Sequence, residues 1–60
     1  MGFSEFQMKV LQAIHKGTAL KISQETVAAI QVLKDYRAII LLENGRYGVT
    51  ASGRAILGVE

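Results

Sequence analysis

Ala38-Ile-Ile-Leu-Leu-Glu-Asn-Gly-Arg-Tyr-Gly-Val-Thr-Ala-Ser-Gly-Arg-Ala-Ile-Leu57 encodes a β-hairpin and then the start of a helix. Asn44-Gly45 separates two segments that are rich in strand-forming residues. A two-residue type I′ turn needs positive φ at both central positions, and Asn and Gly adopt that conformation at the least cost. We therefore predict an antiparallel hairpin of residues 38–43 and 46–50 that turns at Asn44-Gly45.

The periodicity of apolar residues predicts two longer helices before this hairpin. The first covers residues 4–16, with Ser4 as its N-cap and Gly17 as its C-terminal stop. The second covers Gln24 to Tyr36 and begins after Ser23, which is also a favourable N-cap. The residues expected to face the core are Phe3, Phe6, Val10, Leu11 and Ile14 in the first helix, and Thr26, Ala29, Ile30, Leu33 and Tyr36 in the second.

Two short segments complete the expected order of elements. Residues 18–22 alternate weakly between polar and apolar, which suits a short strand or an extended connection. After the hairpin, Thr50 or Ser52 can cap a terminal helix that Gly58 ends. The chain contains no Pro, repeat or linker. We therefore predict one α+β domain over residues 1–60, in the order α-β-α-β-β-α.

Length and composition favour self-association. A domain of sixty residues has little interior, yet half of these residues are hydrophobic and the mean hydropathy is +0.27. The chain has no Cys and one His, so neither disulfides nor thiolate metal sites can stabilise it. We expect a homodimer that uses the first helix or the strand at 38–42, and no metal or cofactor.

The same composition argues against several function classes. The sequence has no Gly-rich phosphate loop, and His15 has no carboxylate at a catalytic spacing, so we expect no enzymatic activity and no small-molecule substrate. No apolar run approaches the length of a membrane span, so we expect a cytoplasmic protein. The net charge of +2 and the pI near 9.3 favour polyanions only mildly.

The second half of the chain resembles a known family. From Ser23 to Arg54 the chain has the pattern Ser-x-Glu-Thr-Val, an apolar strand, an Asn-Gly turn and a returning strand that ends Tyr-x-Val-Thr-x-x-Gly-Arg. This order is similar to that of a winged helix-turn-helix DNA-binding domain. The resemblance implies that the helix before the hairpin enters the major groove and that the hairpin forms a wing on the DNA backbone or minor groove. Five residues separate Gly17 from Ser23. The short helix that the family places there is therefore missing, and the domain is a truncated variant.

The resemblance also implies a set of DNA contacts. The residues expected to face DNA from the second helix and the preceding loop are Lys21, Ser23, Gln24, Gln31 and Lys34, and those expected to hold phosphates are Asn44, Arg46 and Arg54. A Gln side chain can bond adenine in the major groove. Arg54 has an alternative role, in which it packs along the terminal helix or pairs with Glu43 or Glu60.

Two functions follow from these observations. The first is a small transcriptional regulator that binds double-stranded DNA as a dimer. The alternative is a protein–protein interaction module on the same scaffold, which the apolar composition, the weak charge and the expected exposure of Ala28 and Val32 favour.

Overall fold

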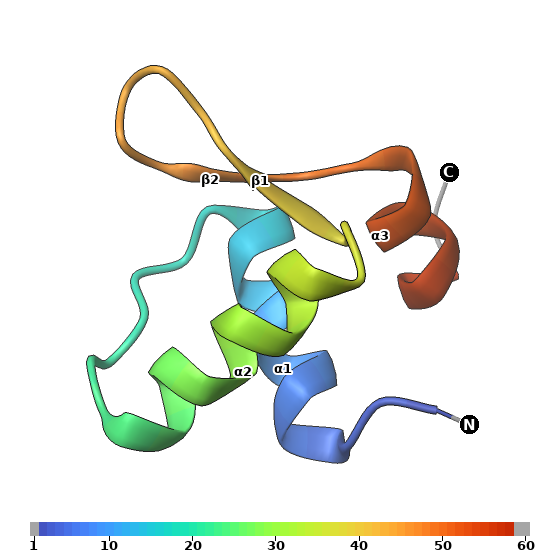
Figure 1. Cartoon of the computed structure of the whole chain (residues 1–60), viewed down its shortest axis with the longest axis horizontal. Helices are drawn as coiled ribbons and strands as arrows, with labels where there is room; N and C mark the ends of the chain where they lie inside the picture. The colour runs from blue at the N-terminus through green and yellow to red at the C-terminus, as the bar shows by residue number, and fades with distance from the viewer. Residues whose placement is uncertain (1, 59–60) are drawn as a thin grey trace.

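The computed structural model describes residues 2–58. Its elements are α1 (Glu5–Lys16), α2 (Gln24–Asp35), β1 (Ile39–Leu41), β2 (Tyr47–Val49) and α3 (Ala51–Leu57). The helices α1 and α2 pack together, the β1–β2 hairpin lies across them, and α3 follows at the base of the hairpin (Figure 1). The predicted α+β class is confirmed at this level.

The helix termini follow the capping residues in the sequence. The Ser4 hydroxyl accepts a hydrogen bond from the Gln7 backbone N–H (3.1 Å), and the Ser4 N–H donates to Gln7 Oε1 (2.9 Å). This reciprocal pair is a capping box, and Gly17 ends α1 in the left-handed conformation at φ 76°. Ser23 caps α2 and Thr50, rather than Ser52, caps α3.

Residues 18–22 contain no strand, so the predicted α-β-α-β-β-α order is wrong at that segment. They form the extended connection from α1 to α2 that the sequence left open. A strand needs a neighbouring strand to satisfy its backbone. Within the described chain the sheet consists of β1 and β2 alone, so residues 18–22 pair with neither strand.

The hairpin forms where it was predicted but its turn differs. Ile39 pairs with Val49 and Leu41 with Tyr47, which leaves Glu43, Asn44 and Gly45 as a three-residue loop. The Gly45 N–H donates to the Leu42 carbonyl (3.0 Å) and the Leu42 N–H to the Arg46 carbonyl (2.7 Å). Gly45 has a positive φ of 81°. Among residues 2–58 Arg37 is the one non-glycine residue with a positive φ, so the φ of Asn44 is negative. The turn is therefore a three-residue loop with a glycine bulge, and the predicted type I′ geometry is wrong at Asn44.

The buried core is small. It consists of the hydrophobic residues Val10, Leu11, Ala29, Leu33, Ala38 and Ile39, with Thr26 buried beside them. Half-buried residues such as Ile14, Ile30 and Tyr47 pack around it. Phe6 and Tyr36, which were expected in the core, are exposed. Tyr36 instead contacts the Phe3 ring edge-on with centroids 5.2 Å apart, and Val32, expected to be exposed, is half-buried.

Gly53 brings α3 against the base of the hairpin. A Cβ at this buried position would overlap the Ala38 carbonyl oxygen and lie 2.7 Å from Val49 Cγ1. The Thr50 hydroxyl accepts from the Gly53 N–H (3.1 Å) and donates to the Arg37 carbonyl (2.6 Å). These contacts fix how β2, α3 and the end of α2 meet. No helix in residues 2–58 is long and apolar enough to cross a membrane.

Candidate nucleic-acid interface

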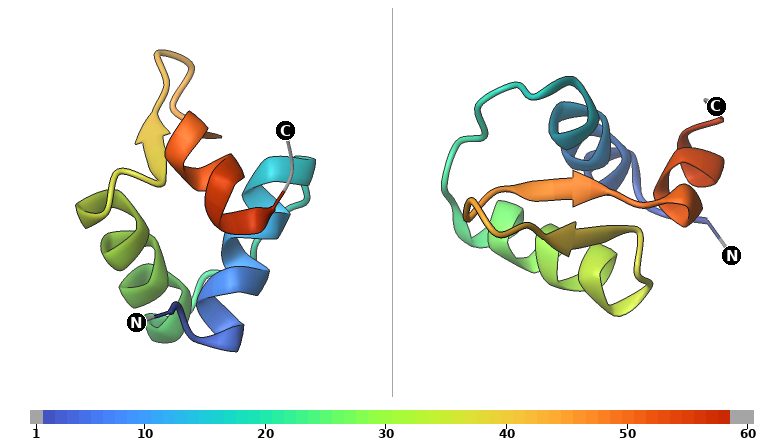
Figure 2. Two further views of the ribbon diagram at one scale, coloured as in Figure 1. Left: turned by 90° about the vertical axis from the view of Figure 1, so that its right-hand side faces the viewer. Right: turned by 90° about the horizontal axis from the view of Figure 1, so that it is seen from above.

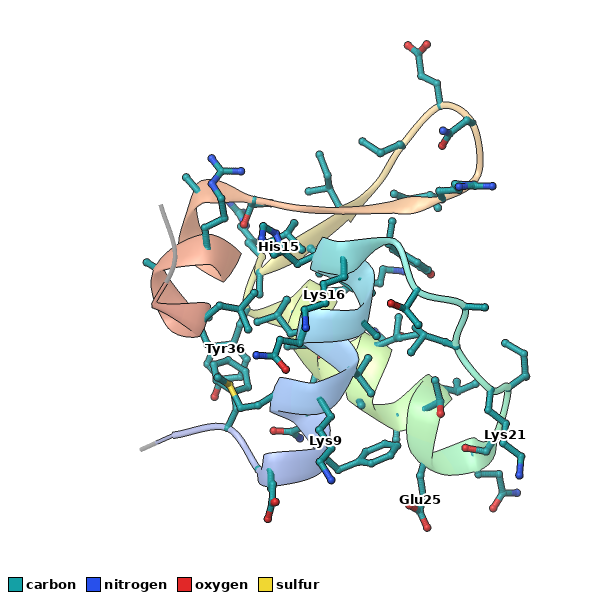
Figure 3. The ribbon with its side chains drawn as sticks, turned by 180° about the vertical axis from the view of Figure 1, so that it is seen from behind. Lys9, His15, Lys16, Lys21, Glu25 and Tyr36 are labelled. Carbon is teal, nitrogen blue, oxygen red and sulfur yellow. The ribbon has the colours of Figure 1, made fainter. Side chains whose placement is uncertain are left out.

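The tip of the hairpin and the loop before α2 lie at the same end of the molecule. Figure 1 shows both on its left side, away from α3. Residues 45–47 and residues 17–20 with Ile22 line one groove, so the two segments face each other. The loop carries Lys21 and leads to Gln24, and the hairpin carries Asn44 and Arg46. We call these four exposed residues the tip surface, although Lys21 does not line the groove and Figure 3 shows it near Glu25, at the end of the connection that is farther from the hairpin.

Asn44 shapes the hairpin tip. Its side-chain Oδ1 accepts a hydrogen bond from the Arg46 backbone N–H at 3.0 Å. Such a bond is typical of an Asn turn and fixes the backbone from which the Arg46 side chain projects. The Asn44 oxygen therefore serves the turn, and its amide N–H groups are what it can offer to a phosphate.

Ser23 caps the start of α2. Its hydroxyl accepts from the Thr26 N–H at 3.2 Å and lies 3.0 Å from Thr26 Oγ1. Because Thr26 is buried, this contact ties the start of α2 to the core. The geometry gives Ser23 a positioning role, and because its side chain is exposed the DNA contact stays a prediction.

The exposed side of α2 carries little positive charge. Gln24 begins the helix and is exposed, whereas Gln31 Nε2 donates to Asp35 Oδ1 at 3.4 Å. The predicted base contact of Gln31 therefore competes with a carboxylate on the same helix. Lys34 is exposed in the last turn of α2, about 15 Å along the helix from Gln24, so it lies away from the tip surface.

Arg54 belongs to the opposite end of the molecule. Its guanidinium Nη1 donates to the Val49 carbonyl at 3.3 Å, and the residue is half-buried. It packs across the β2–α3 junction, as the alternative interpretation expected, and does not join the other predicted phosphate contacts. Pairing with Glu43 is wrong because Glu43 lies in the hairpin loop at the other end, and Glu60 lies outside the described residues.

The structure shows a further pair of cations that the sequence did not predict as site residues. Lys9 and Lys16 are exposed on α1, seven residues apart and so on one face of that helix. Figure 3 shows them from behind, on the side of the molecule that α1 covers. The spacing of two helical turns was the available signal. Of the seven Lys and Arg residues, two belong to the tip surface and two to the α1 face, so the positive charge is spread over the molecule.

The described residues include no group of three or more His, Asp or Glu side chains that could hold a metal ion. Comparisons with protein-family models, with curated proteins and with solved structures found no match. The winged-helix resemblance therefore remains a prediction that rests on residues 23–54.

Proposed function

We propose that this chain binds double-stranded DNA through the tip surface, as a small transcriptional regulator of winged-helix type that acts as a dimer. The observation that carries the proposal is that the hairpin and the connection before α2, which face each other across one groove, each carry an exposed cation, Arg46 and Lys21. Lys21 lies beside the start of α2, and Arg46 lies in the hairpin, which are the two elements that winged-helix proteins use on DNA.

Phosphate contacts supply most of the affinity in such complexes. One copy offers two cations on the tip surface, and Asp35 places a negative charge on the exposed side of α2. A single chain would therefore bind DNA weakly. Two copies on neighbouring half-sites double the number of contacts, which is why the proposal includes a dimer.

Base recognition in this proposal depends on α2. Gln24 has an exposed side chain at the start of the helix, where winged-helix and related domains contact bases. Gln31 reads a base only after it releases Asp35. Replacing Asp35 with Lys removes that competing carboxylate and a repulsive charge together, so Asp35→Lys strengthens binding to random duplex DNA if α2 approaches the DNA.

The test compares two variants that lose one positive charge each. Arg46→Ala removes a cation of the tip surface, and Lys9→Ala removes one from the α1 face. Affinity for a random duplex is measured at several salt concentrations. We expect Arg46→Ala to reduce the slope of log affinity against log salt by about 0.9 for each chain on the DNA, so by about 1.8 in a dimer, and Lys9→Ala to leave it unchanged. Equal slopes for both variants would remove the tip surface as the DNA-binding site.

A second candidate function is a protein–protein interaction module. β1 and the residue after it expose an uncharged apolar run, with Ile40 50%, Leu41 60% and Leu42 41% accessible. Exposed apolar strands of this kind are typical of interaction surfaces. This function replaces DNA binding if the intact chain ignores duplex DNA at low salt.

A further inference from the structure

The groove between the hairpin and the α1–α2 connection is large for so small a domain. It has a volume of about 480 Å³, which lies within the range of small-molecule sites. The left view of Figure 2 shows the hairpin above α1 and α2, and residues 45–47 of the hairpin line the groove. Its walls come from the end of α1, the connection at 17–22, α2 and residues 45–47.

The groove has apolar walls and one charged residue. Ile14, Leu20, Ile30 and Tyr47 line it and are all half-buried, so they contact the core on one side and leave apolar surface on the other. Ile22, at the rim, is 81% exposed. Burying such surface under a ligand is favourable in proportion to the apolar area covered.

The charges of the lining residues indicate which class of ligand the groove can bind. Arg46 lines the groove, and no lining residue is acidic. Glu43, in the same hairpin loop, is exposed and does not line it. An anionic group near Arg46 would thus meet a cation without a competing carboxylate in the walls, while an apolar body covers Ile14, Leu20 and Ile30.

We propose that this groove binds a small organic carboxylate with an apolar body. The carboxylate pairs with the Arg46 guanidinium, and the apolar body lies between the hairpin and the α1–α2 connection. Because Arg46 also belongs to the tip surface, the bound carboxylate competes with a DNA phosphate for the same cation. This competition rests on the proposed DNA binding, whereas the carboxylate site in the groove does not depend on it.

The test uses three probes of equal chain length and different charge: decanoate, decanol and decyltrimethylammonium. Each is titrated into the intact protein without DNA, and the Ile and Leu methyl signals are followed by NMR. We expect decanoate to shift the methyl signals of Ile14, Leu20 and Ile30 and to bind up to about fivefold more tightly than decanol, since an exposed ion pair contributes little more. Decyltrimethylammonium is expected to bind most weakly.

Variants locate the site. Arg46→Gln should abolish the difference between decanoate and decanol. Ile22→Glu places a negative charge at the rim and should weaken decanoate binding by about fivefold. The matched control is Val27→Glu, which changes an exposed apolar residue of α2 outside the groove and should leave decanoate binding unchanged.

Other results would overturn the proposal. Equal affinity for all three probes would show that charge plays no part, and shifts confined to Ile40, Leu41 and Leu42 would move the ligand to the β1 surface. These readouts need no DNA, so a failure of DNA binding leaves them interpretable. If the chain does bind DNA, decanoate should weaken that binding in the parent and not in the Arg46→Gln variant.

Discussion

Replacing Gly53 with Ala tests the packing of α3 most sharply. In an exposed helix this substitution stabilises a protein by roughly 1 kcal/mol, because Ala is the better helix former. At Gly53 the added Cβ meets the Ala38 carbonyl oxygen and lies 2.7 Å from Val49 Cγ1. The first of these atoms belongs to the backbone and cannot rotate away. We therefore expect the sign of the effect to be reversed.

The magnitude follows from two opposing terms. Overpacking of a closely packed site typically lowers the free energy of unfolding by roughly 1–3 kcal/mol. We take about 3 kcal/mol, because the added Cβ meets a backbone atom. After the gain in helix propensity, the net loss is about 2 kcal/mol. In a domain of this size, that loss lowers the melting temperature by roughly 8–16 °C.

The assay is thermal unfolding followed by circular dichroism, with Ser52→Ala as the matched control. Ser52 precedes Gly53 in α3 and is exposed, so its replacement should change stability by no more than about 0.5 kcal/mol. A Gly53→Ala variant that melts at or above the temperature of the parent would refute the close contact between α3 and the hairpin base.

Three further outcomes are expected. Gly45→Val should destabilise the domain by more than about 1 kcal/mol in urea unfolding, because Gly45 has φ 81° and the cost lies in the backbone alone; an unchanged midpoint contradicts the loop geometry. Arg37→Gly should leave stability unchanged or raise it by up to about 1 kcal/mol, since Arg37 is held at φ 60°; a clear loss shows that the side chain matters more than the backbone. Sedimentation should give a dimer mass at tens of micromolar and a monomer mass for Leu41→Lys, a change at an exposed strand position; a monomeric parent counts against the dimer.

Local signals in the sequence predicted the elements well. Ser4, Ser23 and Gly17 act through contacts with residues a few positions away, so their capping roles could be read from sequence alone. The position of the hairpin followed from two strand-forming runs around Asn44-Gly45, but its register is one residue away from that of a two-residue turn, which would pair Glu43 with Arg46. The turn type did not follow, because two-residue and three-residue loops both accept this pair and the pairing of Leu42 with Arg46 decides between them.

Features that depend on how the elements pack together could not be predicted from the sequence. The close approach of Gly53 to Ala38 depends on how α3 folds back, and the positive φ of Arg37 depends on how α2 joins β1. Tertiary packing also separates the residues that were predicted to contact DNA. Arg46 lines the groove and Lys21 does not, while Arg54 turns to the Val49 carbonyl at the other end. Ser23 bonds to Thr26 at the start of α2 and remains exposed.

The most direct test of the proposed function is the salt dependence of binding to a random DNA duplex. Two tip-surface cations per chain, Lys21 and Arg46, give four in a dimer and a slope of about −3.6. Between 50 and 200 mM salt this slope corresponds to a loss of affinity of roughly 150-fold. The account predicts clear binding at the lower concentration and a loss of about this size. An absence of binding at 50 mM salt, or an affinity that does not change with salt, would contradict it.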